Sequence, residues 1–196
     1  MKDNLAFELI FDGQNLIEGE IDVRDLAPSL LSLSELLDEA SFRYAPECPK
    51  ISLRVKPNFE KKCFKIHLDV AQSYYTKFVE LFSSQKAQAW ATLMGIVGLS
   101  GIGLFQLLLK AKKRMPKRVV EIEHTEKVRV IFDEGDDIEV PKEALSLFQN
   151  RRARRAVAHM FKPLKMGGVE TMKVQRGDKT LLEAKAEDSD SFEYEE

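Results

Sequence analysis

The residue types that most often carry out chemistry are scattered along this sequence. The three histidines, His67, His124 and His159, lie on different expected elements, and none has a metal-ligating partner three or four residues away. A structural zinc site needs four convergent nitrogen or sulfur ligands. Cys48 lies in a proline-flanked loop, and no neighbouring residue marks its thiol as reactive. The sequence therefore predicts no catalytic residues, no metal site, no cofactor and a protein that is not an enzyme.

Two further patterns resemble ligand-binding loops without completing them. The glycines of GIVGLSGIG, at 95, 98, 101 and 103, are followed by no Lys-Ser/Thr pair and by no acidic residue on a later strand. Phosphate and dinucleotide loops need those residues. The acidic cluster at 133–139 lacks the terminal glutamate of a calcium loop. We therefore predict that this cluster is a solvated hairpin turn.

Basic side chains gather in two segments, although the whole chain has a formal net charge of −2. Arginines three and four residues apart share one face of a helix, and such a face can neutralise several phosphates. Three partners stay open: nucleic acid, anionic lipid headgroups, and acidic parts of the same protein or of another copy. The candidate basic contacts are Lys110, Lys112, Lys113, Arg114, Lys117 and Arg118 in the first segment and Arg151, Arg152, Arg154 and Arg155 in the second.

The run from 87 to 109 contains no charged residue, in a chain of which 32% is charged. About 20 mostly apolar residues can cross a bilayer. The small residues at 87, 91 and 95 have a spacing that lets two helices approach closely, and the tryptophan at 90 suits a membrane interface. The candidate membrane or oligomer contacts are Ala87, Trp90, Ala91, Gly95, Gly98, Leu99, Ile102 and Phe105.

Three structures remain open for this run. A spanning helix would place the basic 110–118 flank in the cytoplasm, so residues 1–86 would have to cross the membrane without a signal peptide. A re-entrant or interfacial hairpin, turning near Gly98–Gly101, avoids that conflict. The third structure is a buried helical hairpin, in a soluble protein or at its oligomer interface. With only two cysteines, the expected location is cytoplasmic, at the inner face of the membrane if the run meets lipid.

Alternating apolar residues and turn signals predict an α+β fold. Strands are expected at 5–11, 16–23, 51–55 and 63–70, and a helix from Asp25 to Tyr44 carries Pro28 in its first turn. These elements predict an N-terminal β-β-α-β-β antiparallel sheet plus helix, with one sheet face open. A helix at 73–83 then leads into the central apolar helix or helical hairpin.

After Pro116 the pattern predicts a C-terminal β-meander plus helix. Strands are expected at 119–123, 128–132 and 138–140, a helix from Pro141 that continues or restarts after Asn150, and a last strand at 169–174. We therefore divide the chain into an N-terminal α+β part (1–72), a helical segment with the apolar run and basic flank (73–116), a C-terminal meander and helix (117–182), and an acidic disordered tail (183–196).

Several stretches together resemble a family of small uncharacterised proteins from phages, prophages and other bacterial mobile elements. They are FDG, LIEGEIDVRDLAPSLLSLSELLDEA, ISLRVK, the glycine-rich run, and VRVIFDEGDDIEVPKEALSLFQNRRARRAVAHMFKPL. The resemblance covers most of residues 5–165 and carries over no functional residue. It implies a role in phage–host conflict, as a defence component or its antagonist.

Two functional hypotheses result. The first is a non-enzymatic, self-associating module of a phage or mobile element, which forms a homo-oligomer or meets an anionic membrane through 87–109. The alternative is a soluble adaptor that binds nucleic acid, or a protein partner of unknown identity, through the basic helix at Arg151–Arg155.

Overall fold

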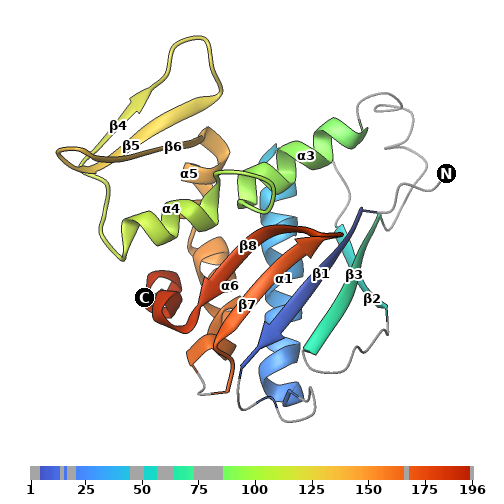
Figure 1. Ribbon diagram of the computed structural model, residues 1–196. Coiled ribbons are helices and arrows are strands. Elements are labelled where there is room, and N and C mark those ends of the chain that lie inside the picture. The colour runs from blue at the N-terminus through green and yellow to red at the C-terminus, as the bar shows by residue number, and fades with distance from the viewer. Residues whose placement is uncertain are drawn as a thin grey trace.

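The computed structural model describes residues 5–13, 16, 21–44, 51–56, 64–72, 86–165 and 168–194 (Figure 1). Helices and antiparallel sheets alternate along the chain, which confirms the α+β class. The elements in chain order are β1 (Leu5–Asp12), α1 (Val23–Tyr44), β2 (Ile51–Lys56), β3 (Phe64–Gln72), α3 (Lys86–Val97), α4 (Leu104–Ala111), β4 (Arg118–Glu121), β5 (Lys127–Asp133), β6 (Asp136–Pro141), α5 (Lys142–Phe148), α6 (Arg151–Met160), η2 (Lys162–Lys165), β7 (Thr171–Arg176), β8 (Lys179–Lys185) and η3 (Ala186–Phe192).

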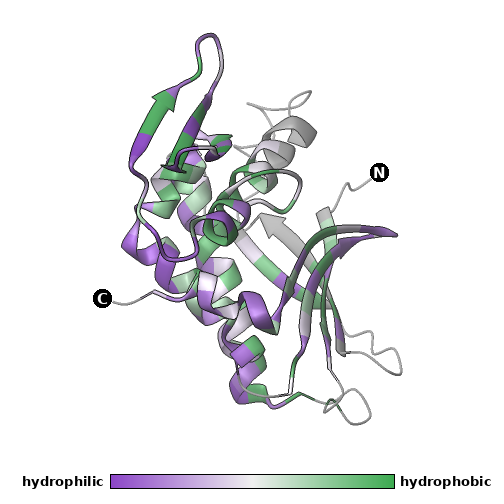
Figure 2. Ribbon diagram, turned by 60° about the vertical axis from the view of Figure 1, so that its left-hand side comes forward, coloured by the Kyte–Doolittle hydropathy of each residue, from purple (hydrophilic) through white to green (hydrophobic). Residues whose placement is uncertain are grey.

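The larger sheet has five antiparallel strands in the order β2-β3-β1-β7-β8. Its central strand is β1, where Leu9 pairs with Ile66 of β3 on one side and with Val174 of β7 on the other. Figure 2 shows the helices gathered on one side of this sheet. Successive residues of a strand point to opposite faces. The face away from the core therefore carries charged pairs such as Lys65–Glu8, whose Nζ and Oε2 are 2.8 Å apart.

This sheet differs from the expected N-terminal β-β-α-β-β unit, because its last two strands come from the far end of the chain. The last strand expected at 169–174 is present as β7, and it pairs with β1 rather than with the meander. The expected strand at 16–23 lies largely outside the described residues, and Val23 begins α1. The expected helix at 73–83 also lies outside them. Alternation identifies a strand but not its partner. The predicted boundary between the helical segment and the C-terminal part, at residue 117, therefore did not anticipate that strands from both ends of the chain form one sheet.

Helix α1 begins slightly earlier than expected and packs against α6. The N–H of Arg24 donates to Oδ1 of Asp22 at 2.8 Å, so Asp22, not Asp25, provides the capping oxygen. Where α1 meets α6, the buried Ser29 hydroxyl of α1 donates a hydrogen bond to the carbonyl of Met160 at 2.8 Å. This bond satisfies one of the carbonyls that the end of α6 leaves without a helical partner.

The meander is confirmed as a three-stranded sheet, β4-β5-β6. It lies apart from the larger sheet (Figure 1), and its buried residues Val130 and Phe132 face the core beside α4 and α5. Pro141 precedes α5, and a new helix, α6, starts after Asn150. The side chain of Asn150 accepts a hydrogen bond from the N–H of Ala153 at 2.9 Å, which fixes that start.

Residues 183–192 form regular structure rather than a disordered acidic tail. Residues 183–185 belong to β8, and η3 follows. The ring of Phe192 is 1% exposed and stacks on Phe161 at 3.8 Å, and Phe161 meets Phe105 edge-on at 5.3 Å. Charge composition suggested a solvated tail, but one buried aromatic anchors the segment.

Candidate functional site: two basic surfaces beside the C-terminal segment

The central apolar run folds back on itself, which confirms a helical hairpin rather than a single central helix. Helix α3 ends at Val97, a turn covers 98–103, and α4 follows. Gly98, Leu99 and Phe105, all expected to contact lipid or another copy, are buried within the subunit. Their expected role is therefore wrong in this fold, because other parts of the same subunit already cover them. Sequence shows that a segment is apolar, but it does not show what covers it.

The remaining candidates of the run divide into two groups. Ile102, at the tip of the turn, is 56% exposed, and Gly95 is partly buried. Ala87, Trp90 and Ala91 belong to α3, but their side chains lie outside the described residues. Self-association through this run therefore stays a prediction. Across the part of the chain that the structure describes, no helix has both the length and the apolarity to cross a membrane.

The glycines of the run shape the hairpin turn. Gly98 has a φ of +97°, which side chains rarely adopt. A Cβ added at Gly103 would lie 2.1 Å from the carbonyl oxygen of Gly95, so only glycine lets α4 approach α3 there. Gln106 closes the turn, because its Nε2 donates to the Gly98 carbonyl at 2.9 Å and its Oε1 accepts the Gly103 N–H at 3.0 Å.

The first basic segment binds the acidic cluster of the meander. Arg114 reaches Asp133 at 3.0 Å and Asp136 at 2.7 Å, and it also donates to the carbonyls that end α4. Lys110 lies 2.6 Å from Asp136, and Lys117 lies 2.5 Å from Asp133. Part of the first basic segment thus has an intramolecular acidic partner, one of the three partners that the sequence left open.

These ion pairs shift the pKa values of the groups that make them. Hydrogen bonds from Lys117 and then Arg114 lower the pKa of Asp133. Hydrogen bonds from Lys110 and then Arg114 lower the pKa of Asp136. In return, chiefly the hydrogen bond to Asp136 raises the pKa of Arg114. All these side chains are substantially exposed, so each pair contributes little to stability by itself.

A third group of cations converges on the end of the chain. Lys113, at the end of α4, and Lys165, in η2, each bond one carboxylate oxygen of Glu193. Arg154 of α6 donates from Nη2 to the Glu193 carbonyl at 3.1 Å. We call Lys113, Arg154 and Lys165 the cationic cradle. In Figure 1 the last described helix, η3, drawn in red, lies beside α4.

The second basic segment forms an exposed stripe along α6. The opposite side of the helix is core, with Ala153, Ala156, Val157 and Met160 no more than 2% exposed. The exposed side continues into η2, and no Phe, Tyr or Trp of α6 lies on it. We call Arg151, Arg152, Arg155, His159 and Lys162 the basic stripe. Among them Arg152 is 86% exposed and lies 3.7 Å from Glu39 of α1.

Arg154 does not belong to the stripe, although the sequence grouped it with its neighbours. Its guanidinium lies 4.9 Å from the ring centre of Phe148 and 5.6 Å from that of Tyr194. Its Nε is buried without a hydrogen-bond partner among the described residues, and burial lowers its pKa. The remaining expected contacts, Lys112 and Arg118, are exposed. Its contacts with these two rings, rather than its position along α6, separate Arg154 from the stripe.

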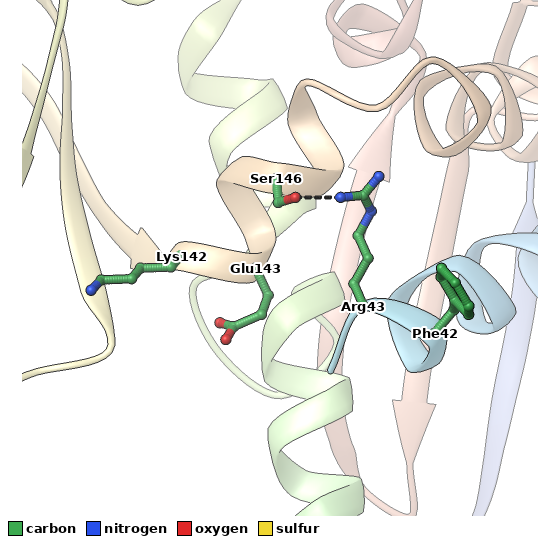
Figure 3. A pocket seen from close by; sticks show the side chains of 5 residues that line it. All are labelled: Phe42, Arg43, Lys142, Glu143 and Ser146. Carbon is green, nitrogen blue, oxygen red and sulfur yellow. Dashed lines mark hydrogen bonds between the residues drawn. The ribbon is translucent and has the colours of Figure 1, made fainter. Parts of the chain in front are cut away.

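An open depression of about 380 Å³ lies between α1 and α5. Figure 3 shows Arg43 donating to the Ser146 hydroxyl, with an Nη1–Oγ distance of 2.6 Å, and Phe42, Lys142 and Glu143 around it. A guanidinium cannot take the proton of a serine nucleophile. This depression therefore offers no activated hydroxyl.

The structure also places the scattered titratable residues. His124 lies in the β4–β5 turn and His159 on the outside of α6, whereas Cys48 and Cys63 lie outside the described residues. Within the described ranges, no three His, Cys, Asp or Glu side chains gather as a metal site would require. In comparisons with protein-family models, curated proteins and solved structures, nothing matches this chain. The resemblance to phage and mobile-element proteins stays a prediction.

Proposed function

We propose that this protein is a non-enzymatic binding module that holds the phosphate backbone of duplex nucleic acid on the basic stripe of α6. The observation that supports this proposal is the grouping of three exposed arginines, with His159 and Lys162, on one side of a helix whose other side is core. Guanidinium groups match phosphate oxygens in a two-pronged geometry. Several guanidinium groups along one side of a helix can therefore bind successive phosphates of a nucleic-acid backbone.

Two arginines of the stripe stand where the helix dipole disfavours cations. Arg151 and Arg152 begin the helix, and no acidic residue lies in its first turn. Cations at a helix N-terminus are disfavoured by about 0.3–1 kcal/mol, whereas phosphates are favoured there. A bound phosphate would offset this unfavourable placement.

Two features favour a duplex over other anionic partners. An interfacial helix inserts its apolar side into a membrane, but the apolar side of α6 is already buried in the core. Binding of single strands relies chiefly on Phe, Tyr and Trp side chains that stack on bases, and α6 has none of these on its exposed side. Phosphate contacts alone suit a regular duplex backbone without sequence preference.

A triple variant, Arg151→Gln with Arg152→Gln and Arg155→Gln, tests this proposal by fluorescence anisotropy on a labelled duplex of about 20 base pairs. Arg154 is kept because it packs between rings. We expect duplex affinity to fall about tenfold or more at low salt. The matched control, Lys127→Gln with Arg176→Gln and Lys179→Gln, removes the same charge from exposed strand positions and should bind like the wild type.

Three outcomes would contradict the proposal. One is that the wild type binds no duplex at low salt, and another is that the control loses as much affinity as the stripe variant. Alternatively, vesicles containing phosphatidylglycerol bind through the stripe while the duplex does not, which would assign the stripe to lipid.

A further inference from the structure

We infer that the cationic cradle is a second phosphate-binding site, which Glu193 fills with its carboxylate in this structure. This inference rests on the proposed function, because the cradle would hold a further phosphate of the same duplex. It assigns to the C-terminal segment the role of a removable cover.

The cradle is assembled from three separate elements. Lys113 comes from the end of α4, Arg154 from α6 and Lys165 from η2, and all three bond the same residue. The two lysines divide the two carboxylate oxygens of Glu193 between them. Phosphate oxygens accept hydrogen bonds from the same donors, so a phosphodiester can replace this carboxylate without a new set of partners.

The backbone at the end of α4 positions one of these cations. Lys112 and Lys113 have φ values of +46° and +65°. Successive non-glycine residues rarely adopt this left-handed conformation, because Cβ then crowds the backbone. Here the conformation ends α4 and leaves Lys113 beside Glu193.

The cradle and the basic stripe share two elements. Arg154 lies on α6 with the stripe arginines, although it packs between rings, and Lys162 and Lys165 lie in the same short η2 helix. A duplex bound to the stripe could therefore place a further phosphate of its backbone in the cradle.

The cover is held at one buried point and by exposed ion pairs. Phe192 stacks on Phe161 in the core. Beyond it, Glu193 meets lysines whose side chains are 42% and 34% exposed, and Lys165 also lies 3.6 Å from Asp190. Exposed ion pairs are weak and screened by salt. A polyanion can therefore compete for these lysines while Phe192 stays in place.

The test uses the full chain with Glu193→Gln, which removes the competing charge and keeps the shape and the Phe192 anchor. Its control is Glu187→Gln, the same change in the same segment, at a residue that pairs only loosely with Lys185 at 3.8 Å. We expect the Glu193 variant to bind duplex about three- to tenfold more tightly, with a salt slope steeper by about one to two. The Glu187 variant should match the wild type. Adding Lys113→Gln and Lys165→Gln to the Glu193 variant should remove the gain.

The outcomes separate this inference from the proposed function. If both glutamate variants bind alike while the stripe variant loses binding, the cradle is wrong and the proposed function stands. If neither the wild type nor any variant binds duplex, both are wrong. If the Glu193 variant gains affinity for phosphatidylglycerol vesicles but not for duplex, the nucleic-acid cradle is overturned in favour of lipid phosphate.

Discussion

Gln106 reaches back across the central hairpin, and its Nε2 donates a hydrogen bond to the carbonyl of Gly98, 2.9 Å away. The same side chain accepts the N–H of Gly103 at 3.0 Å. In the sequence this glutamine only dilutes an apolar run. In the structure it closes the turn that folds the run inside the subunit.

Gln106→Met should destabilise the protein by about 1–3 kcal/mol, because two backbone groups at a partly buried turn lose their partner while the side-chain volume is kept. Urea unfolding measures the change. The control is Gln149→Met, an exposed position just after α5, which should change stability by less than about 0.5 kcal/mol. Equal stability of both variants would show that the bonds of Gln106 do not hold the turn.

Alanine at two glycines of the run should have opposite effects. Gly103→Ala should cost about 3 kcal/mol or prevent folding, because its Cβ would meet backbone at 2.1 Å. Gly95→Ala should be neutral or stabilise by up to about 1 kcal/mol, because Ser100 Oγ, the nearest atom to its Cβ, is 3.8 Å away in an otherwise helical site. Thermal unfolding and sedimentation measure both. If Gly95→Ala instead changed the oligomeric state, this result would support the prediction that the small residues at 87, 91 and 95 pack against another copy.

The ion pairs of the first basic segment predict an acid-sensitive contribution to stability. Lys110 and then Arg114 lower the pKa of folded Asp136. Its contribution is therefore present above the unfolded pKa, near 4, and is lost as the pH falls through the lower folded value. Asp136→Asn should be less stable than the wild type at pH 7, and the gap should close below about pH 4. About 1 M salt should also narrow it at pH 7. A gap that is independent of pH would contradict this role.

Phe192→Ala should destabilise the whole protein by about 3–5 kcal/mol, because the ring is buried and stacked on Phe161. Glu187→Ala, in the same segment but exposed, should have little effect. Denaturant unfolding distinguishes the two. Similar stability of both variants would mean that the segment behaves as the solvated tail that its charge predicts.

Local patterns predicted the elements whose partners are near in sequence. The alternation at 128–132, followed by the acidic turn, gave the meander, and Pro141 and Asn150 marked the starts of α5 and α6. These signals depend on turn and capping residues that act over a few positions. The helical spacing of the arginines likewise predicted a basic face on this helix, although it grouped Arg154 with the three that are exposed.

Partners that are distant in sequence were not predictable. Nothing in β1 indicates that β7 pairs with it, and nothing in Phe105 shows whether it meets lipid, another copy or Phe161. The cradle could not be found either, because its cations lie far apart in the chain and meet only through the fold. The available signal was a pair of aromatic residues, Phe192 and Tyr194, within a predominantly acidic segment.

The salt dependence of duplex affinity tests the central proposal most directly. Each phosphate neutralised by a cation contributes about 0.9 to the slope of log affinity against log salt concentration. Replacing Arg151, Arg152 and Arg155 by glutamine should therefore make the slope shallower by about two to three, and the control set should leave it unchanged. Parallel salt dependences for the wild type and the stripe variant would contradict the assignment of α6 as the surface that holds the backbone.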